Sequence, residues 1–451
     1  MTRDLSRTRS TTASLRRLLS QPHRPDQARW PVVAVYGAVG AASMFALSGG
    51  LLTVGARVMA RLPLVPRDSL RGRQDVTLRA VHPDRVHLDA TKVTRRDGVL
   101  ALRQGGGAAH VRLGPVQGHP TATTVSRPLW AADTEEPLEV ESASSNGFFW
   151  AGTPETAHGL PTEDVEIESP VGRMPAWLVR PDPLRGAAAG NEDTWAILIH
   201  GHGSARGEAL RVIPLLHRLG LTSLTITYRN DVGAPASADR MHHLGSAEWE
   251  DTEAAIDEAV ARGARRILLM GWSMGGGIAL RVSVRSAHRD RIAALVLDSP
   301  AIDWQDILIH HATSLRAPAP MRQLALWMMT SQFGARMVRL HEPLALHEMT
   351  PPYYAEHLTH RTLLFHALDD ETVPPEPSRQ LAAMRPDLIE FVPFEGASHT
   401  REWNRDPIRY ERLLADYLVR VLDLEESVGS IEVPVRDPAS RALEGSIGLR
   451  L

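Results

Sequence analysis

The chain has 451 residues, a formal net charge of −3 at pH 7 and no cysteine. A chain of this length can bury one large hydrophobic core and a smaller second one. The near-neutral charge gives no basis for a nucleic-acid partner, and the lack of cysteine excludes disulfides, thiolate catalysis and cysteine-ligated metals.

An apolar run near the amino terminus is the first feature along the chain. Residues 1–29 are rich in Arg, Ser and Thr and are expected to form a disordered tail. Residues 31–56 carry no charged side chain and are numerous enough to cross a bilayer, so we predict a single-pass membrane anchor over residues 30–60, with a buried helix as the alternative. The arginines that precede the run favour a cytoplasmic amino terminus and an extracytoplasmic remainder, whereas those that follow it oppose this orientation.

Residues 61–155 are expected to form a small β-rich accessory module. Val76–Val81 and Arg85–Leu88 have the character of short strands, and Asp and Pro turn residues separate them. A run of three glycines, Gly105-Gly106-Gly107, interrupts the region. We find no residue pattern in this module that indicates chemistry.

Strands and helices alternate over residues 156–424, which predicts a mostly parallel eight-stranded sheet with helices on both faces. Several of the strands are unbroken apolar runs, as burial on both faces requires. The expected strands are Asp164–Ser169, Pro175–Arg180, Trp195–His200, Thr222–Thr227, Arg266–Gly271, Ala293–Asp298, Thr362–His366 and Leu388–Phe394. The expected helices are Gly207–Leu219, Ala247–Arg262, Gly276–Ala287, Pro375–Met384 and Pro407–Leu424.

One interval departs from this alternation. Residues 299–360 read as a helical insertion rich in Trp and Met, and its position predicts a cap over the carboxyl ends of the strands. Its large apolar side chains either line a pocket for an apolar group or form the core of the insertion itself. Residues 425–451 are polar and are expected to form a flexible tail.

The pentapeptide Gly271-Trp272-Ser273-Met274-Gly275 lies between an apolar strand and a helix. A serine between two glycines on a sharp strand-to-helix turn exposes its hydroxyl as a nucleophile, and side chains at the glycine positions would crowd that turn. We therefore predict Ser273 as a nucleophile. Such a serine needs a histidine to accept its proton and a carboxylate to orient that histidine.

Both partners have candidates in the expected order along the chain. Asp370 follows the strand that ends at His366, and its neighbour Asp369 is the alternative. Asp298, at the end of an earlier strand, is a second alternative acid, although its Ser-Pro neighbours suggest a carboxylate that caps a turn. His399 lies in a glycine-containing loop after the last strand, where the general base belongs.

Two backbone N–H groups are needed to bind the oxyanion of a tetrahedral intermediate. We assign them to Met274, directly after the nucleophile, and to His202 in the glycine-rich turn His200-Gly201-His202-Gly203. That turn could instead serve only to cap the next helix. A metal held by His200 and His202 lacks a third ligand at sensible spacing, so neither a metal nor another cofactor is expected.

From about Pro161 to Leu424 the chain resembles serine hydrolases of the α/β-hydrolase superfamily and is similar to their bacterial esterase-like and prolyl-oligopeptidase-like branch. The resemblance rests on the His200-Gly201 turn, the Ser273 pentapeptide, Leu297–Pro300, the segment from His366 to Pro374, and His399. It implies the α/β-hydrolase fold, with Ser273 as nucleophile, Asp370 as acid and His399 as base. Ala367 and Ser398 replace glycines that are common in the family.

The combined pattern predicts a serine hydrolase that cleaves carboxylic esters, or thioesters or amides, through an acyl-enzyme. Its substrate is expected to be a small ester or amide molecule. An acyltransferase with the same triad is the alternative, and a non-catalytic binding protein on this fold is a further one. The oligomeric state and the acyl-chain length are left open by the sequence.

Overall fold

The computed structural model describes residues 50–66, 74–181, 191 and 193–424. The chain divides into two compact units, residues 1–55 and residues 56–451. Residues 50–61 are helical, but in the described ranges no helix is both long enough and apolar enough to cross a bilayer. Residues 30–49 of the expected anchor, and both expected tails, lie outside the described residues.

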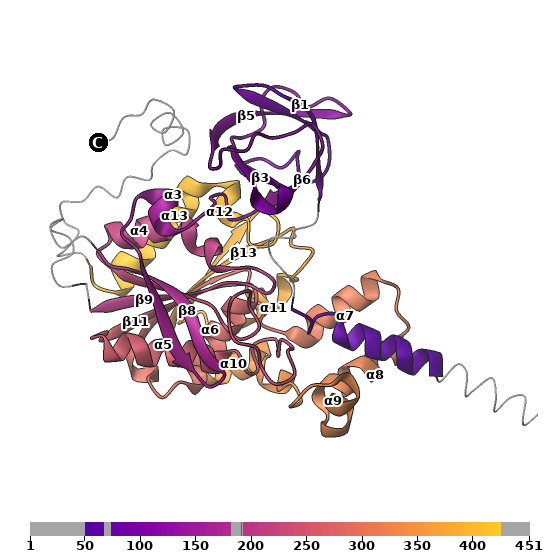
Figure 1. The fold of residues 1–451 in the computed structure, drawn as a ribbon. Helices are drawn as coiled ribbons and strands as arrows, with labels where there is room; N and C mark the ends of the chain where they lie inside the picture. Colours follow the sequence, from indigo (N-terminus) through magenta and orange to yellow (C-terminus); the bar gives the residue numbers. More distant parts are fainter. Residues whose placement is uncertain (1–49, 67–73, 182–190, 192, 425–451) are drawn as a thin grey trace, which may run out of the picture. The chain divides into compact units, whose positions relative to one another are not determined.

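The β-rich module is a closed antiparallel barrel, with strand order β1-β2-β5-β4-β3-β6 (Figure 1). Its strands are β1 (Val76–Val81), β2 (Arg85–Asp89), β3 (Leu100–Gln104), β4 (Ala109–Leu113), β5 (Thr124–Ala132) and β6 (Ser142–Asn146). Its own small core includes Leu78, Leu88 and Val111. The three glycines form a 3-10 turn between β3 and β4, in which Gly106 has a φ of 70° that few other residues adopt readily. The prediction of a β-rich module is confirmed.

The region that follows the barrel is built on an eight-stranded sheet, with strand order β14-β13-β12-β11-β9-β10-β8-β7. Strand β8 is antiparallel to both β7 and β10, and the remaining neighbours run parallel. The strands are β7 (Glu163–Ser169), β8 (Gly172–Val179), β9 (Thr194–Ile199), β10 (Thr222–Ile226), β11 (Arg266–Trp272), β12 (Ile292–Asp298), β13 (Arg361–Ala367) and β14 (Ile389–Phe394). This is the mostly parallel sheet that the alternating pattern predicted.

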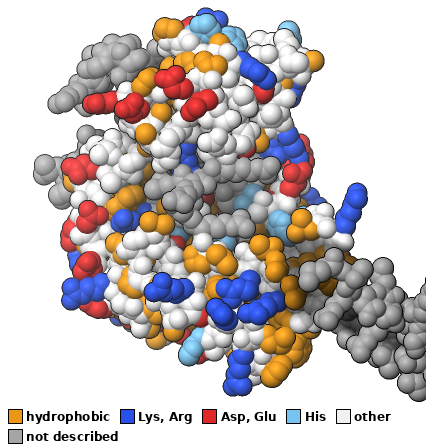
Figure 2. Space-filling view, turned by 45° about the vertical axis from the view of Figure 1, so that its right-hand side comes forward, with side chains coloured by type: hydrophobic (Ala, Val, Ile, Leu, Met, Phe, Trp, Pro, Cys, Tyr) orange, Lys and Arg blue, Asp and Glu red, His pale blue; other side chains and the backbone are white. Residues whose placement is uncertain are grey.

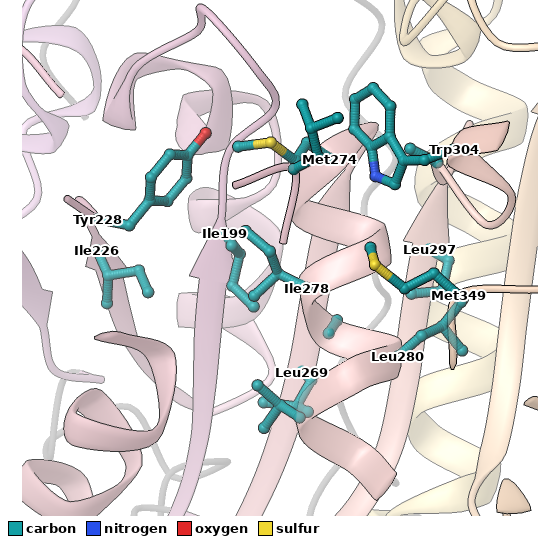
Figure 3. Packing of buried hydrophobic residues seen from close by; sticks show 14 of the residues in the cluster. Ile199, Ile226, Tyr228, Leu269, Met274, Ile278, Leu280, Leu297, Trp304 and Met349 are labelled. Atoms are coloured by element: carbon teal, nitrogen blue, oxygen red, sulfur yellow. The ribbon is translucent and has the colours of Figure 1, made fainter. Parts of the chain in front are cut away.

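Helices cover both faces of this sheet. One face carries α5 (Trp249–Ala261) and α6 (Met274–Arg285), and the other carries α4 (Ile213–Arg218) and α13 (Pro407–Val421) (Figure 1). Successive side chains of a strand therefore enter different cores. Ile197 and Ile199 of β9 belong to the core on the α5 and α6 side, where Figure 3 shows Ile199 beside Ile278, and Leu198 belongs to the opposite core.

One expected helix is divided. The sequence suggested a continuous helix over Gly207–Leu219, but the structure has a 3-10 helix, η3 (Arg206–Arg211), followed by α4. Pro214 explains the break, because it lacks an N–H and its ring would clash with the carbonyl of Leu210 in an uninterrupted helix. The first element after β9 is therefore short, and it stays close to the His200–Gly203 turn.

The insertion after β12 is helical, as expected, and consists of α7 (Trp304–Ser314), α8 (Ala319–Thr330), α9 (Gln332–Val338), η5 (Leu346–Glu348) and α10 (Pro351–His357). Trp304, Met328 and Met329 are buried in its contact with the sheet's core. Leu315, Trp327 and Phe333 are exposed. Figure 2 shows hydrophobic side chains gathered at the lower right of the visible face.

Residues 56–65 pack on the catalytic region. Ala56, Ala60 and Leu64 are fully buried in the same core as α6 and the insertion. Two hydrogen bonds fix the segment: the Arg61 side chain donates through Nη1 to Val338 O at 2.6 Å, and His242 N donates to Leu64 O at 2.7 Å. A short stretch that precedes the barrel in sequence is thus part of the hydrolase core.

Candidate active site

Ser273 lies at the turn between β11 and α6, in a backbone conformation that a serine rarely adopts. Its φ is 51° and its ψ is −116°. Strain of this kind persists only where the surroundings hold it. Two backbone hydrogen bonds do so here: Ser273 N donates to Asp298 O at 2.9 Å, and Ala301 N donates to Ser273 O at 2.9 Å.

The flanking glycines allow three segments to approach closely at this turn. A Cβ atom at Gly271 would overlap the backbone of Gly275, and one at Gly275 would overlap Ile199 O at the end of β9. Any side chain at these positions would push α6 away from the sheet. The glycine requirement inferred from the sequence therefore has a direct steric basis.

Ser273, His399 and Asp370 come together at the carboxyl ends of the strands. Ser273 Oγ lies 2.8 Å from His399 Nε2, and Asp370 Oδ2 lies 2.7 Å from His399 Nδ1. In this arrangement Nδ1 donates its proton to the carboxylate and leaves Nε2 free to accept the serine proton. The geometry is that of a nucleophile, a base and an orienting acid.

Asp370 is held in its ionised form. Burial by itself would raise its pKa, but the charge of His399 and hydrogen bonds from His366, His399 and the Val373 amide lower the pKa well below the usual range. Its second oxygen, Oδ1, accepts from Thr372 N at 2.8 Å and Val373 N at 2.9 Å. The carboxylate is thereby fixed on both sides and aimed at His399.

The two alternative acids have other partners. Asp369 Oδ2 accepts from Gly396 N at 2.9 Å and so braces the loop that carries His399. Asp298 is fully buried at the end of β12, and its Oδ2 accepts from Tyr410 OH at 2.8 Å. Of the three candidates, Asp370 is the one that the structure brings into contact with the imidazole.

The two amides that the sequence assigned to the oxyanion belong to two different segments near Ser273. Met274 is the first residue of α6, so its N–H has no acceptor within the helix. His202 is the second residue of a β-turn closed by Ser204 N donating to Gly201 O at 3.1 Å, and Gly203 supplies the positive φ of 64° at the third position. A Cβ at Gly201 would stand 3.1 Å from Ser273 Cβ, which places this turn directly against Ser273.

Buried side chains that the sequence analysis did not identify hold this turn in place. Glu208 Oε2 accepts from Gly201 N at 2.9 Å and from Ser204 Oγ at 2.7 Å. Tyr228 OH donates to Gly201 O at 2.8 Å. No spacing signal marks Glu208 in the sequence, because its partners are mainly backbone groups that only the fold brings near.

His200 is also accounted for by the fold. It is buried, its Nε2 lies 2.8 Å from Asp231 Oδ2, and its ring stacks on Tyr228 with centroids 4.4 Å apart. Burial opposes protonation of His200, but the Asp231 carboxylate outweighs it and raises the pKa of the imidazole. His200 thus serves as a support beneath the turn.

A cavity of about 410 Å³ opens at Ser273 and His399. Side chains from α7 and α8 line it, among them Trp304, Ile307 and Leu326, and residues 59, 62 and 63 form another part of its wall. Its lining is mainly apolar, and among the described lining residues there is no carboxylate. The insertion's apolar residues therefore do both things that were considered: some form its core and others line the cavity.

Two parts of the chain match family models. Residues 193–350 match the model of the S33 serine aminopeptidase family, a match that includes Ser273 but ends before Asp370 and His399. Residues 77–145, which cover most of the barrel, match a domain of unknown function (DUF8805).

Solved structures with similar architecture include both esterases and peptidases. An esterase from Pyrococcus furiosus is 20% identical, with 60% of this chain and 96% of that chain covered and a TM-score of 0.45. A puromycin-hydrolysing peptidase from Mycobacterium tuberculosis is 19% identical, covering 70% of this chain and 46% of that one at a TM-score of 0.45. An acylaminoacyl peptidase from Pyrococcus horikoshii is 16% identical, covering 71% and 50% at a TM-score of 0.45.

The strand order of the sheet and the serine on its strand-to-helix turn are those of the α/β-hydrolase fold, and residues 193–350 match a serine-hydrolase family model. The chain combines this α/β-hydrolase region with a helical insertion and, on its amino-terminal side, a barrel.

Proposed function

We propose that this protein is a serine esterase that cleaves carboxylic esters with an apolar acyl group through an acyl-enzyme. The observation that carries the proposal is the placement of Ser273 Oγ 2.8 Å from His399 Nε2, at the opening of a mainly apolar cavity. Asp370, 2.7 Å from Nδ1, completes the set of groups that such a reaction needs.

In the proposed reaction Ser273 Oγ attacks the ester carbonyl carbon while His399 Nε2 takes the hydroxyl proton. The carbonyl oxygen becomes an oxyanion that accepts hydrogen bonds from the amides of Met274 and His202. The ester C–O bond then breaks, and His399 gives its proton to the departing alkoxide, which leaves as an alcohol. A water molecule, deprotonated by His399, then attacks the acyl carbonyl carbon. The bond to Ser273 Oγ breaks, His399 returns the proton to Oγ, and the carboxylic acid leaves.

The cavity lining favours an ester over a peptide substrate. An aminopeptidase must bind the α-ammonium group of its substrate, and a carboxylate is the group suited to that task. The described residues that line the cavity include none, whereas Trp304, Ile307 and Leu326 offer an apolar surface. Burial of an acyl chain there contributes about 0.8 kcal/mol for each methylene group removed from water.

Labelling with a fluorophosphonate probe tests the nucleophile. We expect the full-length protein to take up one equivalent of probe and to lose this on Ser273→Ala. Ser283→Ala is the matched control, because Ser283 is also buried but its hydroxyl donates to Leu280 O within α6. Equal labelling of Ser273→Ala and wild type would overturn the assignment.

A substrate panel tests the ester class. Acetyl, butyryl and octanoyl esters of one alcohol should be hydrolysed with kcat/KM rising with acyl-chain length, and amino-acid arylamides should be poor substrates. A folded protein that labels at Ser273 but prefers arylamides would replace the esterase proposal with a peptidase.

A further inference from the structure

Behind the triad lies a second pair of carboxyl groups, Asp298 and Glu402, which no step of the proposed reaction uses. Asp298 ends β12, and Glu402 begins α12 (Glu402–Arg405), three residues after His399. Both side chains are completely buried, and the two carboxyl groups interact with each other. Two ionised carboxylates in contact inside a protein core would repel strongly, because little solvent screens them.

The hydrogen-bond partners of the four carboxyl oxygens show where a proton is needed. Glu402 Oε1 accepts from Ser299 Oγ at 2.6 Å and from Ala367 N at 2.8 Å, and Asp298 Oδ2 accepts from Tyr410 OH. The other two oxygens, Asp298 Oδ1 and Glu402 Oε2, are buried and receive no donor from the described residues. A proton carried by one of the two carboxyl groups would supply the missing donor, and no other described group does so.

The charged groups around the pair fit a single negative charge shared by the two carboxyls. Arg211 of η3 is the cation that interacts with Asp298, and Arg211 in turn contacts Glu208. Tyr410 donates its hydroxyl from α13. Burial and the neighbouring Asp298 charge both raise the pKa of Glu402 well above its ordinary value, so Glu402 is the partner that holds the proton.

The pair of carboxyl groups connects the Ser273 turn with the His399 loop, which must stay at a fixed distance from each other. Asp298 accepts the Ser273 N–H through its backbone oxygen, and it contacts Glu402 through its side chain. Glu402 leads back to the His399 loop, whose Thr400 O also accepts from Arg211 Nη1 at 2.6 Å. A change in the separation of the two carboxyls would therefore move the imidazole relative to the serine hydroxyl.

We propose that Asp298 and Glu402 share one proton and that this pair is a positioning device, which fixes the distance between the Ser273 turn and the His399 loop. Its effect on catalysis rests on the proposed function, whereas the proton itself is a property of the fold. Removal of the proton would set two carboxylates against each other and separate α12 from β12.

The wild-type protein should lose stability as the pH rises. The unfolded chain releases the Glu402 proton above a pH of about 4.3, whereas the folded state retains it. The folded state therefore binds more protons over the interval up to the raised pKa of Glu402, and the free energy of unfolding falls with pH across that interval.

Amide substitutions test the shared proton. In Glu402→Gln the side-chain oxygen can keep the donors Ser299 and Ala367, and the N–H replaces the shared proton. We expect kcat/KM of this variant to stay within about threefold of wild type at pH 6. The alkaline fall of kcat should move to higher pH, and thermal unfolding should depend less on pH.

The matched control is Glu411→Gln. Glu411 is also buried, but it accepts from Trp403 Nε1 at 3.2 Å and pairs with Arg218, whose Nη2 lies 3.3 Å from Oε2. We expect Glu411→Gln to unfold at lower temperature than Glu402→Gln at pH 6. In the double variant Asp298→Asn/Glu402→Gln both side-chain oxygens keep their present donors, so the two NH₂ groups face each other with no acceptor between them. The fall in its unfolding temperature should therefore exceed the sum of the two single falls.

Three results would overturn the proposal. Equal destabilisation by Glu402→Gln and Glu411→Gln would mean that Glu402 is ionised. Additive losses in the double variant would mean that no proton is shared. An alkaline limb of kcat that is unchanged in Glu402→Gln would refute the positioning role. The unfolding measurements do not depend on the esterase activity, so they remain decisive even where the labelling experiment fails.

Discussion

The two walls of the active site are built from different interactions. One wall, which we call the polar wall, consists of the Ser273 turn, the His200–Gly203 turn and the His399 loop. Short hydrogen bonds between buried groups join these segments. On the other wall, α7, α8 and residues 59, 62 and 63 present mainly apolar side chains to the cavity, and the surface that faces the substrate is formed by packed hydrocarbon groups. The first wall has one arrangement that satisfies its donors and acceptors, whereas an apolar wall tolerates exchange of one hydrocarbon side chain for another.

This contrast suggests that the polar wall carries out the reaction and that the apolar wall selects the substrate. A lost partner on the polar wall leaves a buried group unsatisfied and displaces a reacting atom, so its effect should be large and appear in kcat. A lost side chain on the apolar wall removes contact with part of the substrate, so its effect should be small and vary with the substrate. Three substitutions test the contrast, in decreasing order of expected effect.

Asp370→Asn should have the largest effect. The amide cannot stabilise the imidazolium and favours the wrong tautomer of His399, so we expect kcat for an aryl ester to fall by about 10⁴-fold. Steady-state kinetics on the folded variant measure the effect. Asp369→Asn is the control, because Asp369 contacts Gly396 N and not His399. The reverse ranking of the two variants would show that Asp369 is the orienting acid.

Glu208→Gln should have an intermediate effect. Glu208 Oε2 holds Gly201 N and Ser204 Oγ, and its Oε1 faces Arg211 Nη2 at 3.4 Å, so an amide must turn an N–H toward a donor. We expect kcat to fall by roughly 10- to 100-fold with little change in KM. The turn would shift, and the His202 N–H would no longer point at the oxyanion at hydrogen-bond distance.

Glu253→Gln is the control for this experiment, because Glu253 Oε1 also accepts a backbone N–H, from Ala287, which follows the end of α6 opposite to Ser273. A fall in kcat of the same size in both variants would indicate a general loss of stability. An unchanged kcat in Glu208→Gln would show that the turn keeps its geometry without the carboxylate.

Residues of the polar wall could be predicted from the sequence only where a residue type suited to catalysis follows a recognisable strand. Ser273 and His399 could be located because a glycine-flanked serine follows a strand and a histidine follows the last one. Asp370 could be preferred over Asp369 as the acid, but Asp369 could not be excluded. Adjacent residues after a strand differ only in the direction of their side chains, which the sequence does not show. Glu208 and Glu402 were missed, since their partners are distant in sequence and consist largely of backbone groups.

The fold shows a similar division. The buried strands of the sheet were located closely because unbroken apolar runs need no partner to be recognised. The barrel's later strands were not, and β5 shows why: Pro128 interrupts its pattern, and Arg127, a buried residue, donates to the carbonyls of Thr94 and Gly114. An arginine that is satisfied by loop carbonyls in the interior has no signature in hydrophobic periodicity.

Leu326→Ala should have the smallest and most selective effect. Leu326 lies on α8 in the cavity lining, and truncation removes apolar contact with the acyl chain but leaves the carbonyl carbon where it was. We expect kcat/KM for an octanoyl ester to fall about tenfold relative to an acetyl ester, the effect of losing one or two methylene contacts. Leu324→Ala, on the same helix but outside the cavity lining, should leave the octanoyl-to-acetyl ratio unchanged. Equal losses for both esters in Leu326→Ala would mean that the apolar wall also positions the reacting atoms, and the division between the two walls would then fail.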